Sequence, residues 1–495
     1  MGLVSPRSAF FWTKKETFNS DIHFKWDSIK NFLYIAFTYS SSTNMIALFT
    51  VVQDGVRIYD YLILQIIVGI TYMAMDFFIK QYTSKVDFNA LLNPLLRGIT
   101  YGTILQSGMR AIENAVDLSD FVRYLISSFK RPPGWSFCTK TTNSTSKCLS
   151  GEDIYTRCFY TKTPFRDSAV HRYYVYSFQQ ADRSIITTRG FTIAVIWIVN
   201  FFLSSTTDFI IVRMVKISFI WTMLSTLVTL VLLISHPSNH GYTALTQMLN
   251  ISNPTTFKCA MDHVAQTYAI GYIGIHDFNS MSPYTMIDNS IIIFTIIHIL
   301  YAFSRALTTR ILVLILRECV EISSELRNLD YHYLIFAVTP MSMNFLSLEN
   351  FYTTNFFITL TILTTTNIAM ITVTLGKMLH SEFLSIRNVY LIGLFCVFGF
   401  IFSIFFITGF LPLKIYVNGL LLGVKNAVLL LGSYKVACIM YIYGVKTFTT
   451  DIHFWLGYKP TKFWTYNWTI MPIILLVIIF ILVFHKRSNA SLYSW

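Results

Sequence analysis

Residues 32–52 read FLYIAFTYSSSTNMIALFTVV, a hydrophobic stretch with a polar centre at 38–44. It is long enough to cross a membrane, since a spanning helix needs roughly 20 mostly apolar residues. Hydroxyl and amide groups are costly to bury at the middle of a bilayer unless they find partners. The three consecutive serines at 40–42 also compete for backbone hydrogen bonds and weaken a helix. The stretch therefore predicts a membrane segment with an unusual centre.

Two structures are consistent with this polar centre. One is a broken helix, which survives at that depth only where protein or a water-filled cavity surrounds it, and which is typical of a secondary transporter's binding site. The other is a continuous helix whose serines bond back to preceding carbonyl groups. Residues 264–279 favour the first, because this second hydrophobic segment is interrupted by Gly271 and Gly274. Paired interruptions at corresponding places in two halves are typical of an inverted-repeat transporter.

The composition excludes an ordinary soluble domain. Of 495 residues, 54% are hydrophobic and only 13% are charged, and the mean hydropathy is +0.53. The net charge of +13 fits basic cytoplasmic loops and requires no nucleic-acid partner. We find no nucleophile elbow, phosphate loop or His-Glu-x-x-His motif, and His276, His298 and His453 are isolated, so we do not expect an enzyme.

We expect an all-α polytopic membrane protein with an inverted five-plus-five helix repeat, broken first and sixth spans, and one further C-terminal span. The eleven expected spans are about 32–52, 58–80, 98–127, 190–206, 212–235, 262–278, 288–314, 356–376, 389–411, 414–443 and 468–485. The transmembrane domain covers 29–486, with repeat one at about 29–235, repeat two at about 260–443, and tails at 1–28 and 487–495. Segment 334–350 is short and holds Pro340, so we expect a helical hairpin over the outer mouth.

The polar loops predict the orientation in the membrane. The basic N-terminus indicates a cytoplasmic start, which places the large loop at 130–188 outside the cell. In that loop Cys138 and Cys148 lie close together and predict a disulfide in an oxidising compartment. Sequons at Asn143 and Asn250 are candidate glycosylation sites on the same side. We therefore expect a multi-pass protein of the plasma membrane.

The third span carries a polar stripe. Arg110, Glu113, Asp117 and Asp120 recur at spacings of three and four, so they share one face of a helix. Charges inside a span normally face the bundle interior or a cavity, which favours a stripe that faces the substrate. The alternative is a self-neutralising pair of Arg110 and Glu113, with the other two carboxylates near the membrane surface.

Several motifs, in order and at matching spacing, resemble one family. They are YIYGVKTFTTDIHFWLGYKPTKFWTYNW at 441–468, GITYMAMDFFIKQY at 69–82, RGITYG at 97–102, and the loop with Trp135, Cys138 and Cys148. Together they resemble the sodium:neurotransmitter symporters, solute carrier family six, from about Trp26 to Phe484. The resemblance implies a two-repeat transporter whose central site lies between spans one, three, six and eight.

The resemblance also implies ligands. Matched by position, the substrate contacts are Tyr39, Ser41, Ser42, Arg110 and Asn114, the sodium ligands are Phe37, Ser40, Asn44, Leu363, Thr366 and Asn367, and the chloride ligands are Tyr61 and Gln266. Oxygen atoms from hydroxyls, amides and carbonyls suit a hard cation such as sodium. The expected partners are a small-molecule solute and the lipid bilayer, with sodium as the coupling ion and chloride as a further ion.

The departures from the family pattern define two functional hypotheses. The outer-gate arginine is replaced by Ala47 and its acidic partner by Asn418, while Ile270 and Ile296 remove side-chain ligands of the first sodium site and of chloride. The first hypothesis is a sodium-coupled symporter of a small amino-acid-like or neurotransmitter-like solute that uses at most the second sodium site, with an acidic solute if Arg110 faces the cavity. The second is a transport-inactive paralogue that acts as a binding or regulatory subunit.

Overall fold

The computed structural model describes residues 29–40, 58–83, 97–138, 148–158, 160, 162–179, 183–206, 208–235, 240–249, 256–274, 287–321, 331–346, 348–383, 385–407, 427–457 and 459–490. The expected ligands Ser41, Ser42 and Asn44, and both sequon asparagines, Asn143 and Asn250, lie outside these residues. So do Ala47 and Asn418, the two altered gate positions.

The first half of the chain supplies the helices that surround the centre of the bundle. After a helix at 29–40, its elements are α3 (Ile58–Leu64), η1 (Gln65–Gly69), α4 (Ile70–Thr83), α6 (Arg97–Ser128), α7 (Gly151–Arg157), β1 (Thr163–Pro164), η3 (Phe165–Asp167), α8 (Ala169–Tyr174), η4 (Val175–Gln179), α9 (Arg183–Ser205), α10 (Asp208–Ile234) and α11 (His240–Leu249).

The second half begins with the helix that precedes the expected second break. Its elements are α12 (Thr256–Thr267), α13 (Ile287–Cys319), β2 (Val320–Glu321), α14 (Tyr331–Tyr333), η7 (Leu334–Val338), α15 (Thr339–Met343), α16 (Glu349–Glu382), α17 (Asn388–Ile407), η8 (Cys438–Gly444), α19 (Val445–Leu456) and α20 (Lys462–Ala490). Residues 427–437 form a further helix that runs into η8.

Eight helices in the described part of the chain are long and apolar enough to cross a membrane, and each overlaps an expected span. The other three expected spans fall short of that criterion for different reasons. The first reaches the edge of the described residues at Ser40, and the sixth is interrupted after α12. The third, α6, is 32 residues long but carries the polar stripe, which lowers its hydropathy. An all-helical membrane protein is confirmed, apart from two two-residue strands, β1 and β2, that pair in parallel.

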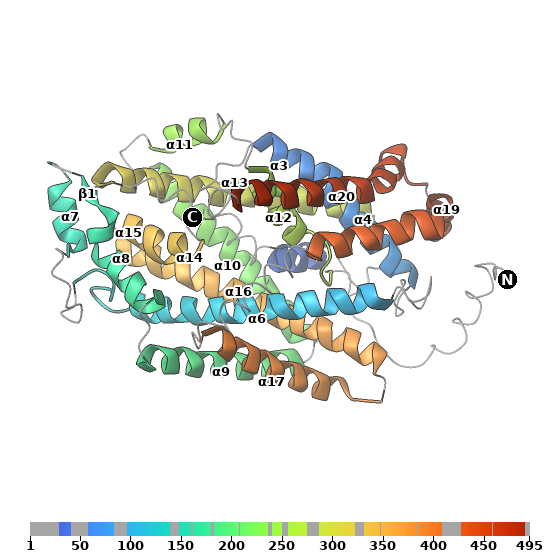
Figure 1. Cartoon of the computed structure of the whole chain (residues 1–495), viewed down its shortest axis with the longest axis horizontal. Coiled ribbons are helices and arrows are strands. Elements are labelled where there is room, and N and C mark those ends of the chain that lie inside the picture. Colours follow the sequence, from blue (N-terminus) through green and yellow to red (C-terminus); the bar gives the residue numbers. More distant parts are fainter. Residues whose placement is uncertain are drawn as a thin grey trace.

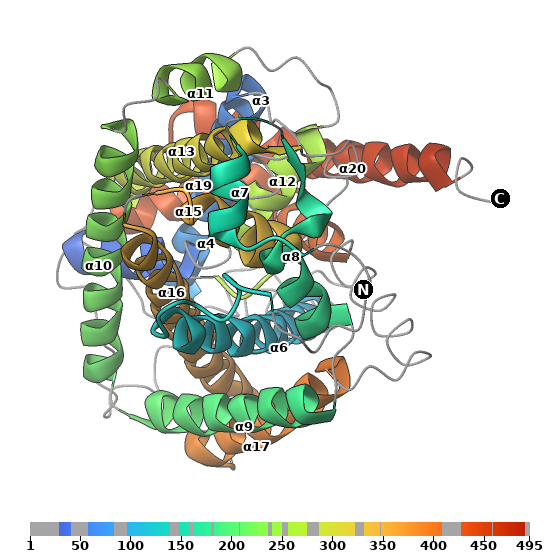
Figure 2. The ribbon, with the colours of Figure 1, turned by 90° about the vertical axis from the view of Figure 1, so that its left-hand side faces the viewer.

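The long helices run along the long axis of the molecule in Figure 1, with α7 and α8 at one end and α19 at the other. Figure 2 shows α9 and α17 as a pair on one face of the bundle, against α6 and α16. Small residues permit this close approach, because a Cβ at Gly399 of α17 would lie 2.4 Å from the Trp197 ring of α9. The Trp197 indole N–H donates to Ser403 Oγ at 3.1 Å, which satisfies the one polar atom of that side chain.

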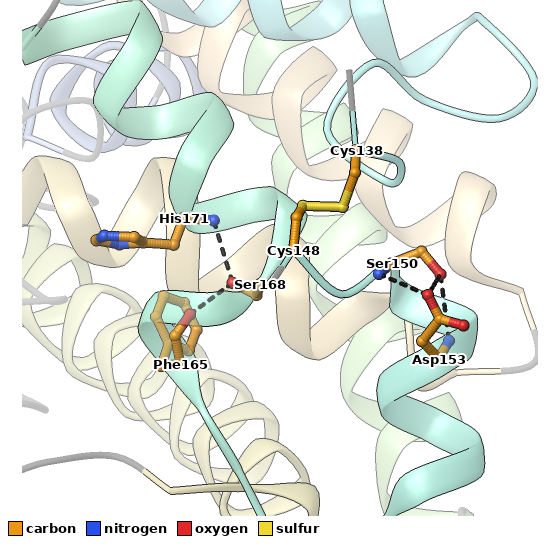
Figure 3. Close-up of a disulfide and its surroundings, with 7 residues drawn as sticks. All are labelled: Cys138, Cys148, Ser150, Asp153, Phe165, Ser168 and His171. Carbon is orange, nitrogen blue, oxygen red and sulfur yellow. Dashed lines mark hydrogen bonds between the residues drawn. A yellow bond between two sulfur atoms is a disulfide. The ribbon is translucent and has the colours of Figure 1, made fainter. Parts of the chain in front are cut away.

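Two disulfides fasten the large loop at one end of the bundle. The expected Cys138–Cys148 bond is present (Figure 3) and lies beside the capping box of α7, in which Ser150 and Asp153 satisfy each other's backbone N–H groups. A second bond, Cys158–Cys319, was not expected from the sequence and ties the loop to the end of α13.

Candidate functional site

The chain leaves helical geometry directly after α12, as the glycine-interrupted segment predicts. Residues 268–274 form turns and irregular backbone, with left-handed φ values of 55° at Ala269 and 73° at Gly271. Two features exclude a side chain at Gly271. Its φ lies in the left-handed region, and a Cβ there would lie 2.0 Å from the Val428 carbonyl oxygen. The second predicted break is therefore confirmed as an irregular turn inside the bundle.

Side chains from three other segments satisfy the backbone of this turn. The Gly271 N–H donates to the Tyr72 hydroxyl of α4 at 3.3 Å. The Ile273 N–H donates to Ser107 Oγ of α6 at 2.8 Å, and the Tyr39 hydroxyl donates to the Ile273 carbonyl at 2.5 Å. Irregular backbone at membrane depth requires such partners, since no water is available in the hydrocarbon. The turn, α4, α6 and Tyr39 of the helix at 29–40 thus meet at one place.

Arg110 lies where these segments meet. It is only 4% exposed, and its guanidinium carbon is 5.0 Å from the centre of the Tyr39 ring and 5.1 Å from that of Tyr272. Its two aromatic neighbours come from the helix at 29–40 and from the turn after α12. Stacked arginines keep a planar fork of donors that matches a carboxylate. Two of the expected substrate contacts, Tyr39 and Arg110, are therefore brought together.

Asn367 connects the other expected contacts. Its amide nitrogen donates to the Tyr39 carbonyl at 2.7 Å, and its amide oxygen accepts a hydrogen bond of 3.0 Å from the Asn114 amide. All three residues are buried. This chain of bonds joins α16 to α6 and to the helix at 29–40, and it fixes which end of the Asn367 amide faces each neighbour.

The remaining expected sodium ligands lie on the same two segments. Ser40 Oγ donates to the Phe37 carbonyl at 3.0 Å, and Thr366 Oγ1 donates to the Leu363 carbonyl at 2.9 Å. Carbonyl and hydroxyl oxygens are the type of ligand that a hard cation prefers. Asn367 differs, because it turns its nitrogen toward the Tyr39 carbonyl. Asn367 thus bridges the two segments in this structure.

The expected chloride ligands border a cluster of buried polar groups. The Tyr61 ring of α3 packs against His263 of α12, with 5.1 Å between ring centres, one turn before Gln266. His263 in turn lies 5.7 Å from His298 of α13. The expectation that His298 is isolated is therefore wrong, because α12 and α13 bring these two histidines side by side. Nearby, the Tyr268 hydroxyl lies within hydrogen-bond distance of Gln65 Oε1 and, at 3.0 Å, of Thr295 Oγ1.

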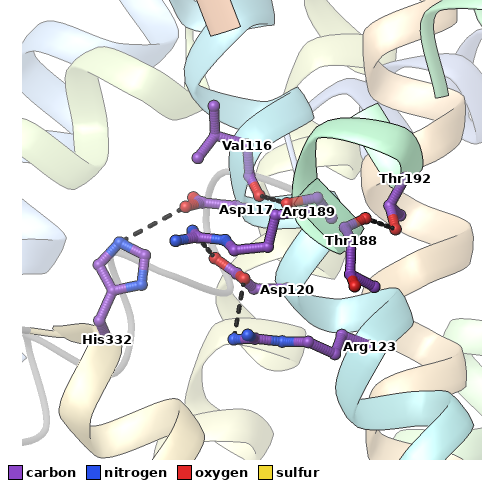
Figure 4. A network of polar contacts seen from close by, with 9 residues as sticks. Val116, Asp117, Asp120, Arg123, Thr188, Arg189, Thr192 and His332 are labelled. Carbon is purple, nitrogen blue, oxygen red and sulfur yellow. Dashed lines mark hydrogen bonds and ion pairs between the residues drawn. The ribbon is translucent and has the colours of Figure 1, made fainter. Parts of the chain in front are cut away.

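The outer part of the polar stripe serves a different purpose from Arg110. Figure 4 shows Asp120 between two arginines, with Arg189 of α9 at 2.7 Å and Arg123 at 3.2 Å. Asp117 faces His332 of α14, whose Nε2 lies 3.5 Å from the carboxylate. Arg110 therefore belongs to the central site, whereas Asp117 and Asp120 belong to ion pairs, of which the one from Asp117 reaches the segment 331–343.

Sequence reasoning missed Tyr272, Ser107 and Tyr72, which complete the surroundings of the turn. Tyr72 and Ser107 contact the turn through their hydroxyl groups, whereas Tyr272 belongs to the turn and places its ring beside Arg110. Such residues are too common in membrane helices to attract attention by type alone. Only their positions identify them, because their role becomes clear once the fold shows that the backbone of the irregular turn needs hydrogen-bond partners.

Comparison with known proteins identifies relatives. The family model described as "Sodium:neurotransmitter symporter family" matches residues 49–495. The chain is also similar to the sodium-dependent neutral amino acid transporter B(0)AT1 of Mus musculus and of Rattus norvegicus, with 31% identity over 64 residues in each case. That stretch is 13% of this chain and 10% of each relative, so the chain aligns with about a tenth of their length.

Proposed function

The chain belongs to the sodium:neurotransmitter symporter family, whose members are transporters and not enzymes, and we propose that it carries a small amino-acid-like solute across the plasma membrane by sodium-coupled alternating access. The observation that carries this proposal is the meeting of Tyr39, Arg110 and the irregular turn 268–274 at one buried place. Irregular backbone in a membrane segment, beside the buried positive charge of Arg110, suits a solute with a negatively charged end.

We propose a carboxylate as that charged end. The Arg110 guanidinium offers parallel N–H donors, which bind a carboxylate in a bidentate manner. The rings of Tyr39 and Tyr272 lie beside the guanidinium. The expected contacts Ser41, Ser42 and Asn114 complete the proposed site.

We propose that sodium binds between the helix at 29–40 and α16. Its proposed ligands are the oxygens of Phe37, Ser40, Leu363 and Thr366, joined by Asn44. A cation held between two segments stabilises the conformation in which they lie close, so its binding free energy adds to that of the solute when both favour the same conformation. The proposal requires no ion at the first sodium site, where Ile270 occupies the aligned position of a ligand.

Uptake into liposomes that contain only this chain tests the proposal. We expect an inward sodium gradient to drive uptake of labelled glutamate or leucine, and a choline gradient to drive none. Arg110→Ala should abolish uptake, whereas Arg97→Ala should not, because Arg97 lies on the same helix with 53% of its side chain exposed. Equal uptake with sodium and choline contradicts the coupling, and full activity of Arg110→Ala contradicts the carboxylate site.

One observation favours the second hypothesis, a transport-inactive binding or regulatory subunit. The Asn367 amide joins Tyr39 to α16 without help from an ion, so the junction that sodium is proposed to hold is already closed. The same liposomes separate the two proposals, since sodium-dependent uptake by the chain alone excludes the inactive subunit.

A further inference from the structure

A small cavity lies between α10, α13, α15 and α16, away from α3 and α12, which carry the expected chloride ligands. Its lining includes Ser225 of α10, Arg305 of α13, Thr339 of α15, and Asn355 and Phe356 of α16. The cavity volume is about 20 Å³. One water needs at least about 10–15 Å³ by that measure, so the cavity accommodates a single small guest.

Arg305 brings a charge to this cavity. It is 5% exposed, and its guanidinium carbon lies 5.9 Å from the centre of the Phe356 ring. Within the described part of the chain, no carboxylate forms an ion pair with it. Arginine keeps its proton in proteins, and a buried charge without a counter-charge is strongly unfavourable. An anion in the cavity would therefore stabilise the Arg305 charge better than a water molecule would.

The other lining groups define what kind of anion fits. The hydroxyls of Thr308, Thr309 and Thr339 donate to carbonyls of their own helical segments at 2.8, 3.0 and 2.8 Å, so their protons are already used. The donors that remain are the N–H groups of Arg305, those of the Asn355 amide, and the Tyr352 hydroxyl. A cavity lined by hydrogen-bond donors favours a guest that only accepts hydrogen bonds. The volume holds one small guest and is too small for a solute that carries a carboxylate.

We infer that this cavity binds a monatomic anion, chloride under physiological conditions, as the counter-ion of Arg305. The ion would bridge α13 to α16 beside the segment 331–343, whose Thr339 lines the same cavity. The site shares no residue with the chloride ligands expected from the family, Tyr61 and Gln266. Anion binding at this site does not depend on transport activity, because the ion binds to the folded chain without a solute.

Thermal unfolding of the purified full chain tests it, with sodium constant and chloride exchanged for gluconate. We expect the midpoint to rise with chloride and with bromide, since a ligand of the folded state alone stabilises it. Arg305→Gln keeps most of the side-chain length but removes the charge, and it should weaken the apparent chloride affinity about tenfold or more, as loss of a charged hydrogen bond does. Arg305→Lys should retain a chloride response.

Two matched variants identify the site. Arg310→Gln removes an arginine of the same helix that contacts Gln247 instead of the cavity, and Tyr61→Phe removes an expected ligand elsewhere. Both should keep the chloride response. An unchanged response in Arg305→Gln, no response in the wild type, or its complete loss in Tyr61→Phe would each overturn the inference. If Arg305→Gln does not fold, wild-type crystals grown in bromide decide: an anomalous peak in the cavity supports the site, and its absence refutes it.

Discussion

The side-chain amide of Asn367 donates a hydrogen bond of 2.7 Å to the main-chain carbonyl of Tyr39, which lies 328 residues earlier in the sequence. Both residues are buried. The bond satisfies a carbonyl at the end of the described part of the first helix, where a helix leaves its last carbonyl groups without partners. One side chain of α16 thus completes the backbone of a segment in the other half of the chain.

Asn367→Ala should destabilise the protein by about 1–3 kcal/mol, because it leaves the Tyr39 carbonyl and the Asn114 amide buried without this partner. The measurement is the shift of the thermal midpoint in detergent. Asn350→Ala is the matched control on the first turn of the same helix, where the side chain is partly exposed, and it should shift the midpoint little. Equal shifts for both variants would show that the bridge contributes nothing.

Gly271→Ala tests the irregular turn. The φ of 73° disfavours a side chain by roughly 1–2 kcal/mol, and the new Cβ would lie 2.0 Å from the Val428 carbonyl oxygen. We therefore expect a low yield of folded protein, measured by size-exclusion chromatography.

Gly98→Ala is the control for this substitution. Gly98 lies in α6, where a Cβ would meet nothing within 4 Å, and alanine there should leave the protein equally or slightly more stable. A well-folded Gly271→Ala protein with unchanged stability would contradict the geometry of the turn.

The buried ion pair of Asp76 and Lys435 predicts a strong non-additive effect. Lys435 Nζ lies 2.8 Å from Asp76 Oδ1, and the side chains are 15% and 3% exposed. Lys435→Met or Asp76→Leu alone should cost about 3–5 kcal/mol, because each leaves one charge buried without its partner. The double variant should recover much of that loss. Additive losses in a double-mutant cycle would mean that the two charges do not interact.

The sequence predicts the interruption after α12 well and the partners of that turn poorly, whereas most of the break expected at 38–44 lies outside the described residues. The glycines at 271 and 274 mark the turn after α12, because a helix interrupted at membrane depth has a local signature. The residues that satisfy the turn, such as Ser107 and Tyr72, come from distant segments and have no such signature. Spacing likewise predicts the nearby pair Cys138–Cys148, whereas Cys158 and Cys319 are 161 residues apart and only the fold brings them together.

The polar stripe on α6 shows the same limit within one helix. Its periodicity correctly indicates a shared buried face, but it does not reveal that Arg110 faces Tyr39 while Asp120 faces Arg189. Periodicity fixes the direction of a side chain on its own helix. The partner in that direction depends on how α6 packs against α9, α14 and the first helix, and this is a property of the whole bundle.

His171 predicts a pH dependence at the loop end of the molecule. Its Nδ1 lies 2.6 Å from the Tyr333 hydroxyl, which joins α8 to α14. Burial, reinforced by Arg166 and Arg172, holds the pKa of His171 below its usual value of 6.5. The unfolded chain therefore binds more protons than the folded chain once the pH falls below about 6.5, so stability should decrease there and stay constant above it.

The thermal midpoint measured between pH 8 and pH 5 checks this prediction, and His171→Gln should flatten its decline below pH 6.5. Glutamine can still hydrogen-bond to Tyr333 but does not titrate, so the variant separates protonation from the loss of the contact. His453→Gln, an exposed site on α19 at the other end of the bundle, is the control and should keep the wild-type decline. If His171→Gln declines as steeply as the wild type, acid acts on another group and the contact with Tyr333 does not sense pH.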